Sequence, residues 1–143
     1  MYQMVIEQTK KYRKRVNYNP VTDTFDETMY DSLFYRRNFL QPYGWIKELG
    51  TPPEPHWDVI LMSYDHYELG DIVEINIIGV FKRNDGDHKF IAVKKDRDIN
   101  TLFDLPQPEL DSLKNLYPVI GEDEGWFGKT IAKKCLMECE KAL

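Results

Sequence analysis

The stretch IGVFKRNDGDHKFIAV, residues 78–93, has the clearest structural pattern in the chain. Two runs rich in Val, Ile and Phe flank an Asp85-Gly86 turn, which is the pattern of a β-hairpin. Asp85 and Asp87 would lie at the mouth of this hairpin, and Lys89 would follow on the same side as Asp87. Carboxylate oxygens on a turn suit Mg2+, and a neighbouring lysine suits a phosphate group. Most Asp-Gly turns are turns only, so the hairpin alone leaves both interpretations open.

The segments around this hairpin predict an α+β domain in which strands come first and helices later. Runs rich in Val and Ile, bounded by Gly, Asp, Asn or Pro, are typical of strands. They occur at residues 4–8, 15–19, 58–63, 71–83 and 88–95. Apolar residues at helical spacing predict helices at residues 108–116 and 129–143. Residues 34–45 are rich in aromatic side chains and predict no regular element. This order favours a small barrel with helices packed outside it.

Size and composition predict one domain, residues 1–143, and disfavour several functional classes. The chain is 42% hydrophobic and 30% charged, it lacks a secretory signal pattern, and no apolar run approaches the roughly 20 residues that span a bilayer. The net charge of −5 disfavours nucleic-acid binding, because phosphate contacts need a concentrated positive surface. Cys135 and Cys139 lie four residues apart in one predicted helix. This spacing predicts core packing without a disulfide framework, and hence a reducing, cytoplasmic location.

Several catalytic classes lack their characteristic motifs. The sequence contains no HExxH or CxxC spacing, no GxSxG elbow, no Walker loop and no GxGxxG turn. Nucleophilic catalysis by Ser or Cys is therefore unsupported. The basic run KKYRKR at residues 10–15 predicts either a solvated edge or a cluster of cations that faces phosphate.

Residues 78–93 resemble the hairpin of the soluble family I inorganic pyrophosphatases, in which an IGV-K strand and a K-IAV strand flank an acidic loop. Other stretches resemble the same family in the same order: VIE at 5–7, PYGWI at 42–46, DVIL at 58–61, FDLP at 103–106 and GW at 125–126. The similarity spans nearly the whole chain. It implies an OB-like five-stranded antiparallel β-barrel with flanking α-helices, which are mostly C-terminal.

The resemblance also implies roles for individual residues. Metal binding, with Mg2+ as the cofactor, is implied for four carboxylates: Glu7, Asp58, Asp85 and Asp87. Catalysis is implied for two of these, Asp58 and Asp85. Phosphate binding is implied for three residues: Arg15, Tyr43 and Lys89. Arg15 stands where the family has a lysine, and the two side chains are not equivalent ligands.

The stretch TPPEPHWDVIL at residues 51–61 departs from the family's D-G-D-P-x-D-V motif. The family spacing places Pro53, Pro55 and Asp58 at the three carboxylate positions, so two of the three carboxylates are missing. Glu54 and His56 lie beside these positions and are the candidates to supply substitute ligands. Prolines fix φ and narrow the freedom of the segment. The stretch therefore predicts an altered metal site, in which the backbone stays stiff but the negative charge is lower than in the family motif.

Other departures lie elsewhere in the chain. Asn17 replaces a family glutamate, and Arg36 or Arg37 stands in for a phosphate-binding arginine. Tyr117 aligns with an aromatic core position. The acidic residues 122–124 lie where the family has cations, and they predict either a solvated turn or a compensating metal cluster.

Two functions follow from these patterns. The first is a divergent Mg2+-dependent inorganic diphosphatase that hydrolyses pyrophosphate or a related phosphoanhydride with weakened or altered activity. The second is a catalytically inactive relative that uses the barrel to bind phosphate, another ligand or a protein partner. The resemblance further implies a homo-oligomer with the C-terminal helix as a candidate contact. The net charge and the lack of a long apolar run predict neither nucleic acid nor a membrane as a partner.

Overall fold

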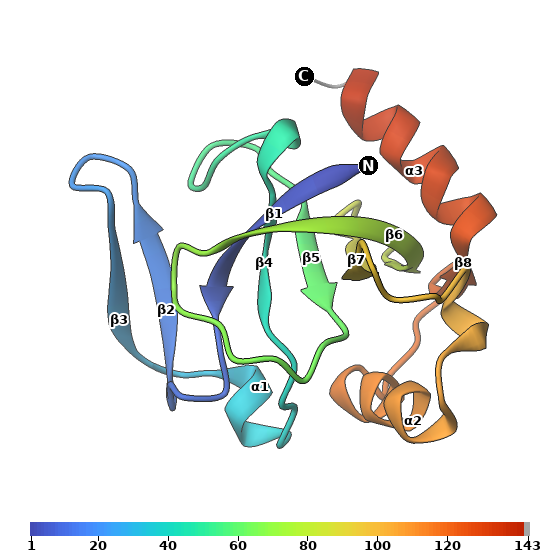
Figure 1. Ribbon diagram of the computed structural model, residues 1–143, viewed down its shortest axis with the longest axis horizontal. Coiled ribbons are helices and arrows are strands. Elements are labelled where there is room, and N and C mark those ends of the chain that lie inside the picture. The colour runs from blue at the N-terminus through green and yellow to red at the C-terminus, as the bar shows by residue number, and fades with distance from the viewer. Residues whose placement is uncertain (142–143) are drawn as a thin grey trace.

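The computed structural model describes residues 1–141 and contains a closed, mixed five-stranded barrel (Figure 1). Its strands are β1 (Tyr2–Gln8), β4 (Tyr43–Ile46), β5 (Asp58–Leu61), β6 (Ile72–Lys82) and β7 (Lys89–Lys94). They pair in the order β1-β4-β5-β7-β6, and pairing between β1 and β6 closes the barrel. Strand β8 (Gly125–Gly128) adds to the free edge of β6. Strands β2 (Lys14–Asn19) and β3 (Thr24–Asp31) form a separate hairpin at the left of Figure 1.

One pair of barrel strands departs from the predicted antiparallel arrangement. β5 and β7 run parallel, with Asp58 opposite Lys89, whereas the other barrel pairs are antiparallel. The parallel pair arises because β7 is the return strand of the β6–β7 hairpin, and β6 closes the barrel against β1 on its other side. Since β5 and β7 begin at the same end of the barrel, their first residues, Asp58 and Lys89, become neighbours.

The helices cover two apolar clusters. α3 (Lys129–Lys141) packs against the first cluster, which includes Val59 and Leu61 of β5. α1 (Leu33–Arg36) and α2 (Gln107–Leu116) contribute to the second cluster, which includes Ile60. Strand β5 is therefore buried on both faces, and this explains why its sequence is continuously apolar after Asp58. The two cysteines of α3 are free and buried in the first cluster, which confirms the predicted core packing.

The sequence patterns identify the buried elements and miss the exposed or short ones. The predicted strands correspond to β1, β2, β5, β6 and β7, and the predicted helices to α2 and α3; residues 142–143 lie outside the described part. The aromatic stretch at 34–45 was predicted to be irregular, and this is correct only for residues 37–42; residues 34–36 belong to α1 and residues 43–45 to β4. β3 was missed because its side chains are mostly exposed and polar, and β8 because it has only four residues. Within residues 1–141, no helix is long and apolar enough to cross a membrane.

Candidate active site

A cavity of about 440 Å³ opens at the end of the barrel where β5 and β7 begin. Six of the seven residues that the resemblance implied for the site line this cavity: Glu7, Arg15, Tyr43, Asp58, Asp87 and Lys89. Other parts of its wall come from the β2 strand and from the proline-rich segment before β5: Asn17, Tyr18, Pro52, Pro53 and His56. The topology thus gathers residues that are up to 82 positions apart in the sequence, from Glu7 to Lys89.

Asp85 does not line this cavity, although the resemblance implied that it binds metal together with Asp58 and Asp87. It lies on the exposed turn between β6 and β7, where its Oδ1 accepts a hydrogen bond from the Asp87 backbone N–H at 2.9 Å. This bond is the usual way in which an aspartate stabilises its own turn. The Asp85 carboxylate is therefore used within its own turn. The sequence pattern of an acidic turn does not show whether an aspartate binds its own turn or a metal ion.

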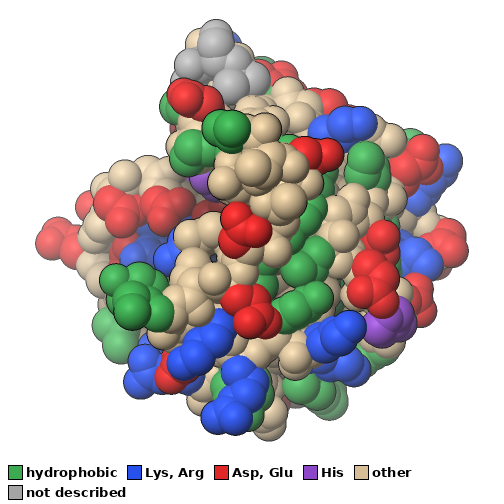
Figure 2. Space-filling model, turned by 90° about the vertical axis from the view of Figure 1, so that its left-hand side faces the viewer, with side chains coloured by type: hydrophobic (Ala, Val, Ile, Leu, Met, Phe, Trp, Pro, Cys, Tyr) green, Lys and Arg blue, Asp and Glu red, His purple; other side chains and the backbone are tan. Residues whose placement is uncertain are grey.

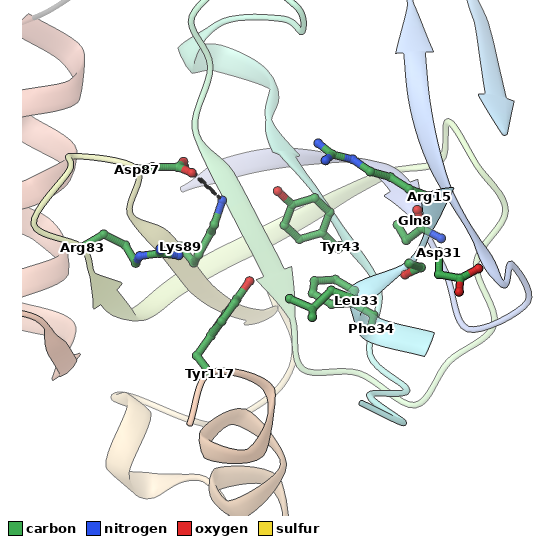
Figure 3. Close-up of a pocket in the computed structure, with 11 residues that line it drawn as sticks. Gln8, Arg15, Asp31, Leu33, Phe34, Tyr43, Arg83, Asp87, Lys89 and Tyr117 are labelled. Atoms are coloured by element: carbon green, nitrogen blue, oxygen red, sulfur yellow. Dashed lines mark hydrogen bonds and ion pairs between the residues drawn. The ribbon is translucent and has the colours of Figure 1, made fainter. Parts of the chain in front are cut away.

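Lys89 occupies the centre of the charged cluster. Its Nζ lies 2.6 Å from Asp58 Oδ2 and 3.2 Å from both carboxylate oxygens of Asp87. The lysine side chain is only 11% exposed. Burial alone would lower the pKa of Lys89, but the negative charges of Asp58 and Asp87 outweigh burial and raise it. The ammonium group is therefore a permanent cation in the wall of the cavity, and Figure 3 shows it directed toward Asp87.

Asp58 is held by two cationic or proton-donating neighbours. In addition to Lys89, His56 places its Nε2 at 3.2 Å from Asp58 Oδ1, and the His56 Nδ1 lies 2.8 Å from the Glu54 carbonyl oxygen. Burial would raise the pKa of Asp58, but the hydrogen bonds from His56 and Lys89 and the charge of Lys89 lower it to about 2. The hydrogen bond between His56 and Asp58 also raises the pKa of His56. Asp58 is consequently ionised at neutral pH.

Glu7 enters the cavity through an irregularity in β1. The pairing of β1 with β4 shifts between Ile6 and Gln8, so Glu7 has no partner of its own on β4. Such bulges re-aim a side chain relative to a regular strand. The Glu7 carboxylate accepts a hydrogen bond from the Tyr18 backbone N–H at 3.2 Å. Burial is the largest influence on its pKa and raises it above the ordinary value.

Tyr43 and Arg15 supply donors on the other walls of the cavity. Tyr43 pairs with Ile60, two residues after Asp58, which brings the tyrosine and the aspartate to the same face. Burial and the nearby Asp58 charge raise the pKa of Tyr43 well above its usual value, so its hydroxyl keeps its proton. Arg15 extends from β2, and within residues 1–141 it forms no ion pair. Its guanidinium group remains available to an anion.

The altered motif at 51–61 is divided between the cavity and the surface. Pro53, at the first missing carboxylate position, lines the cavity, whereas Pro55 does not. Of the two candidate substitute ligands, His56 lines the cavity and contacts Asp58. Glu54 is exposed and does not line the cavity; its backbone carbonyl fixes the His56 ring. The segment therefore places the His56 imidazole in the site, but before Asp58 it supplies no carboxylate there.

The described residues do not fit a metal centre built by the protein alone. Within residues 1–141, no three His, Cys, Asp or Glu side chains form a group arranged to hold a metal ion. Two of the carboxylates that line the cavity, Asp58 and Asp87, share Lys89 as their counter-ion. The acidic residues 122–124 form a turn at the surface, where the Glu124 carboxylate accepts hydrogen bonds from the Gly121 and Asn84 backbone. This contact supports the structural interpretation of that turn.

A second cavity of about 320 Å³ adjoins the first and shares Arg15, Tyr43, Asp87 and Lys89 with it (Figure 3). Its remaining wall includes residues that the sequence did not single out for a site: Leu33, Phe34, Arg83 and Tyr117. Tyr117 was predicted as a core aromatic, and it does pack against Phe81 and Trp126. Leu33 and Phe34 lie in α1, Arg83 follows β6 and Tyr117 follows α2. None of them belongs to a motif that indicates a ligand, so sequence patterns alone could not have found this part.

Comparisons with known proteins agree with this architecture. The inorganic pyrophosphatase family model matches residues 4–142. The structure is similar to that of an inorganic pyrophosphatase from Neisseria gonorrhoeae, with a TM-score of 0.77, 23% identity, and coverage of 98% of this chain and 89% of that one. The inorganic pyrophosphatase from Helicobacter pylori has a TM-score of 0.72 and 21% identity, with coverage of 98% of this chain and 91% of that one. For the inorganic pyrophosphatase from Thermus thermophilus, the TM-score is 0.68 and the identity 18%, with coverage of 96% of this chain and 87% of that one.

No curated protein sequence matches the chain. At these identities the structural matches establish the fold, and they confirm the predicted barrel. The family itself is established by the match of its model to nearly the full length. The chain belongs to the inorganic pyrophosphatase family.

Proposed function

We propose that this protein is a divergent inorganic diphosphatase, which hydrolyses pyrophosphate or a related phosphoanhydride more slowly than a complete carboxylate site would. The observation that carries the proposal is the convergence of Arg15, Tyr43 and Lys89 on a cavity that also holds Asp58 and Asp87. Two permanent cations and a protonated phenol suit the oxygens of a diphosphate. Charge-assisted hydrogen bonds of this kind are the strong ones in proteins.

The reaction is the attack of water on one phosphorus atom, which breaks the P–O–P bridge and releases two phosphates. Arg15 and Lys89 bind the phosphate oxygens and stabilise the charge that develops on them. Asp58 orients the water and accepts its proton. A base works best when its pKa lies near the working pH, and the Asp58 pKa of about 2 makes it a weak proton acceptor. Weak activity is therefore an expected property of this site.

In this proposal, magnesium binds to the site together with the substrate. The described carboxylates do not form a metal centre of their own, but Mg2+ commonly binds through one or two carboxylates together with substrate phosphates. We propose that the substrate is the magnesium complex of pyrophosphate. Glu7, Asp58 and Asp87 line the cavity, and at most two of these three carboxylates contact the magnesium of that complex, while Asp85 remains with its turn.

Replacing Pro53 with aspartate is expected to strengthen Mg2+ binding by on the order of tenfold, because an added anionic oxygen attracts the cation into a cavity that already holds the carboxylates of Glu7, Asp58 and Asp87. Pro53 lines the cavity and Pro55 does not. Pro55→Asp is therefore the matched control and is expected to leave Mg2+ affinity unchanged. Isothermal titration with Mg2+ measures both variants beside the unmodified protein. Tight binding by the unmodified protein, with no gain from Pro53→Asp, would show that the site is already complete.

A second candidate function is supported by the ion pair between Lys89 and Asp58. A site in which lysine neutralises the carboxylates can bind phosphate without turning it over, so the protein would then be a phosphate-binding relative without catalysis. A phosphate-release assay with pyrophosphate and Mg2+, run beside a panel of nucleotides, separates the two functions. Release above the uncatalysed rate supports the diphosphatase. Binding without release supports the second function and contradicts the first.

We further propose a cytoplasmic homo-oligomer. The free cysteines suit a reducing compartment. Large hydrophobic side chains are exposed on the surface, among them Met29 and Tyr30 of β3 and Met137 of α3. Figure 2 shows hydrophobic side chains lying among charged ones on the face that it presents. Light scattering coupled to size exclusion is expected to give a mass that is a multiple of 17.0 kDa. A single species of 17.0 kDa would contradict the proposal.

A further inference from the structure

The cavity that holds Lys89 continues away from the charged cluster as a groove. The second cavity, of about 320 Å³, shares Leu33, Arg83 and Tyr117 with a third cavity of about 250 Å³. Each cavity therefore shares wall residues with the next, in the order first, second, third. Arg15 and Lys89 line the second cavity as well as the first, so a pyrophosphate ion held by them can extend into the second. The third cavity shares no wall residue with the first, and pyrophosphate leaves it unfilled.

The outer part of the groove differs chemically from the inner part. Its walls include aromatic and apolar residues, with Tyr117 on one side and Leu33 on the other (Figure 3). The charged side chains of Arg37, Arg83 and Glu124 also line the third cavity. The Tyr117 ring is stacked on Phe81 with their planes 1° apart and centroids 5.1 Å apart, and Trp126 supports Phe81 at 4.6 Å. Packing against Phe81 and Trp126 thus holds the Tyr117 ring in place. Rigid aromatic surfaces beside a cationic groove are typical of sites that bind nucleotide bases.

Arg83 adds unused hydrogen-bonding capacity at the same place. It lines both outer cavities. Its buried Nε forms an ion pair with Glu124, at 3.4 Å from Oε2, and within residues 1–141 this Nε has no hydrogen-bond partner. Its guanidinium lies 5.8 Å from the centroid of the Phe81 ring. A guanidinium with free donors beside an aromatic wall suits the carbonyl, ring-nitrogen or ribose oxygen acceptors of a nucleoside.

We infer that the groove binds nucleoside diphosphates. This inference rests on the proposed function, because the diphosphate group takes the place of pyrophosphate beside Arg15 and Lys89. The base lies between Tyr117 and Leu33, and Arg83 donates hydrogen bonds to the nucleoside. The substrate class of the site is then an organic phosphoanhydride with a flat substituent.

Two ligands that resist cleavage test this assignment: imidodiphosphate and α,β-methylene-ADP, each titrated calorimetrically in the presence of Mg2+. The nucleotide analogue is expected to bind about tenfold more tightly than imidodiphosphate, because base–aromatic stacking adds to the diphosphate contacts. Leu33→Ala and Arg83→Gln are each expected to reduce this preference at least threefold and to leave imidodiphosphate affinity unchanged. Leu40→Ala is the matched control, since Leu40 is exposed and lines a different cavity.

Each outcome bears on the assignment. If imidodiphosphate binds and the nucleotide analogue binds no more tightly, the groove is not a nucleoside site, while the proposed function survives. The same conclusion follows if the two variants weaken both ligands equally. If neither ligand binds, the proposed function and this inference both fail. Thermal melts establish that each variant is folded; should Leu33→Ala not fold, the unmodified protein and Arg83→Gln decide the question.

Discussion

Replacing Lys89 with methionine is expected to weaken the binding of pyrophosphate roughly 100-fold and to reduce phosphate release to the uncatalysed rate. Lys89 is a cation common to both cavities of the site. Hydrogen bonds to charged groups contribute about 1.5–3 kcal/mol each, and about 1.4 kcal/mol corresponds to a tenfold change in affinity. Methionine keeps much of the side-chain volume and removes the charge. Isothermal titration with pyrophosphate and Mg2+ measures the loss.

The same substitution leaves Asp58 without its closest counter-ion. Removing one partner of a buried pair costs about 3–5 kcal/mol when the other charge stays uncompensated; His56 still contacts Asp58, so we expect about 3 kcal/mol of lost unfolding free energy. Lys94→Met is the matched control. Lys94 lies on the same strand and pairs with Asp65 at 2.7 Å, but it is outside both cavities.

Binding should be compared at a temperature at which circular dichroism shows all three proteins to be folded. Lys94→Met is expected to bind pyrophosphate as the unmodified protein does. Equal affinity in Lys89→Met and the unmodified protein would remove Lys89 from the site. It would also remove the main support for the proposed function.

Replacing Gly44 with alanine is expected to prevent folding, with a loss of more than about 4 kcal/mol of a total stability on the order of 5–15 kcal/mol. An added Cβ at Gly44 would lie 1.8 Å from the Val5 carbonyl oxygen and 2.8 Å from its carbonyl carbon. Both are backbone atoms of β1, so no side-chain rotation relieves the overlap. Strands β1 and β4 would have to separate, and the Glu7 bulge beside Gly44 would be lost with their pairing.

Gly125→Ala is the control for this second prediction. Gly125 also lies in a strand, and an added Cβ there would meet only the Phe127 ring, at an ordinary 3.6 Å. Its effect on the free energy of unfolding is expected to stay within about 1 kcal/mol. Urea unfolding followed by circular dichroism measures both variants. A Gly44→Ala protein as stable as Gly125→Ala would show that β1 and β4 do not approach as closely as the structure has them.

The barrel could be predicted from the sequence because its strands carry strong local patterns. Val, Ile and Phe around the Asp85-Gly86 turn identify β6 and β7, and burial on both faces makes β5 continuously apolar. The parallel pairing of β5 and β7 could not be predicted from these patterns, because it depends on how the barrel closes rather than on any one strand. β3 escaped prediction for a different reason, since its exposed side chains do not alternate.

Most of the residues implied for the site line one cavity, but their contacts with one another could not be predicted. Spacing relative to the family motifs placed Glu7, Asp58 and Lys89 in one cavity. The same spacing also proposed Asp85, because the sequence cannot show that its carboxylate bonds to its own turn. The outer groove was not predictable. Leu33 and Arg83 become neighbours only after folding, and neither belongs to a motif that indicates a ligand.

The central claim is that a diphosphate binds between Lys89 and Arg15 without a metal centre built by the protein alone. A crystal structure with imidodiphosphate and Mg2+ tests it most directly. We predict that the diphosphate contacts Arg15, Tyr43 and Lys89, and that phosphate oxygens together with at most two protein carboxylates hold the magnesium. A structure in which the diphosphate lies outside this cavity, or in which three or more protein carboxylates hold the metal, would contradict the account.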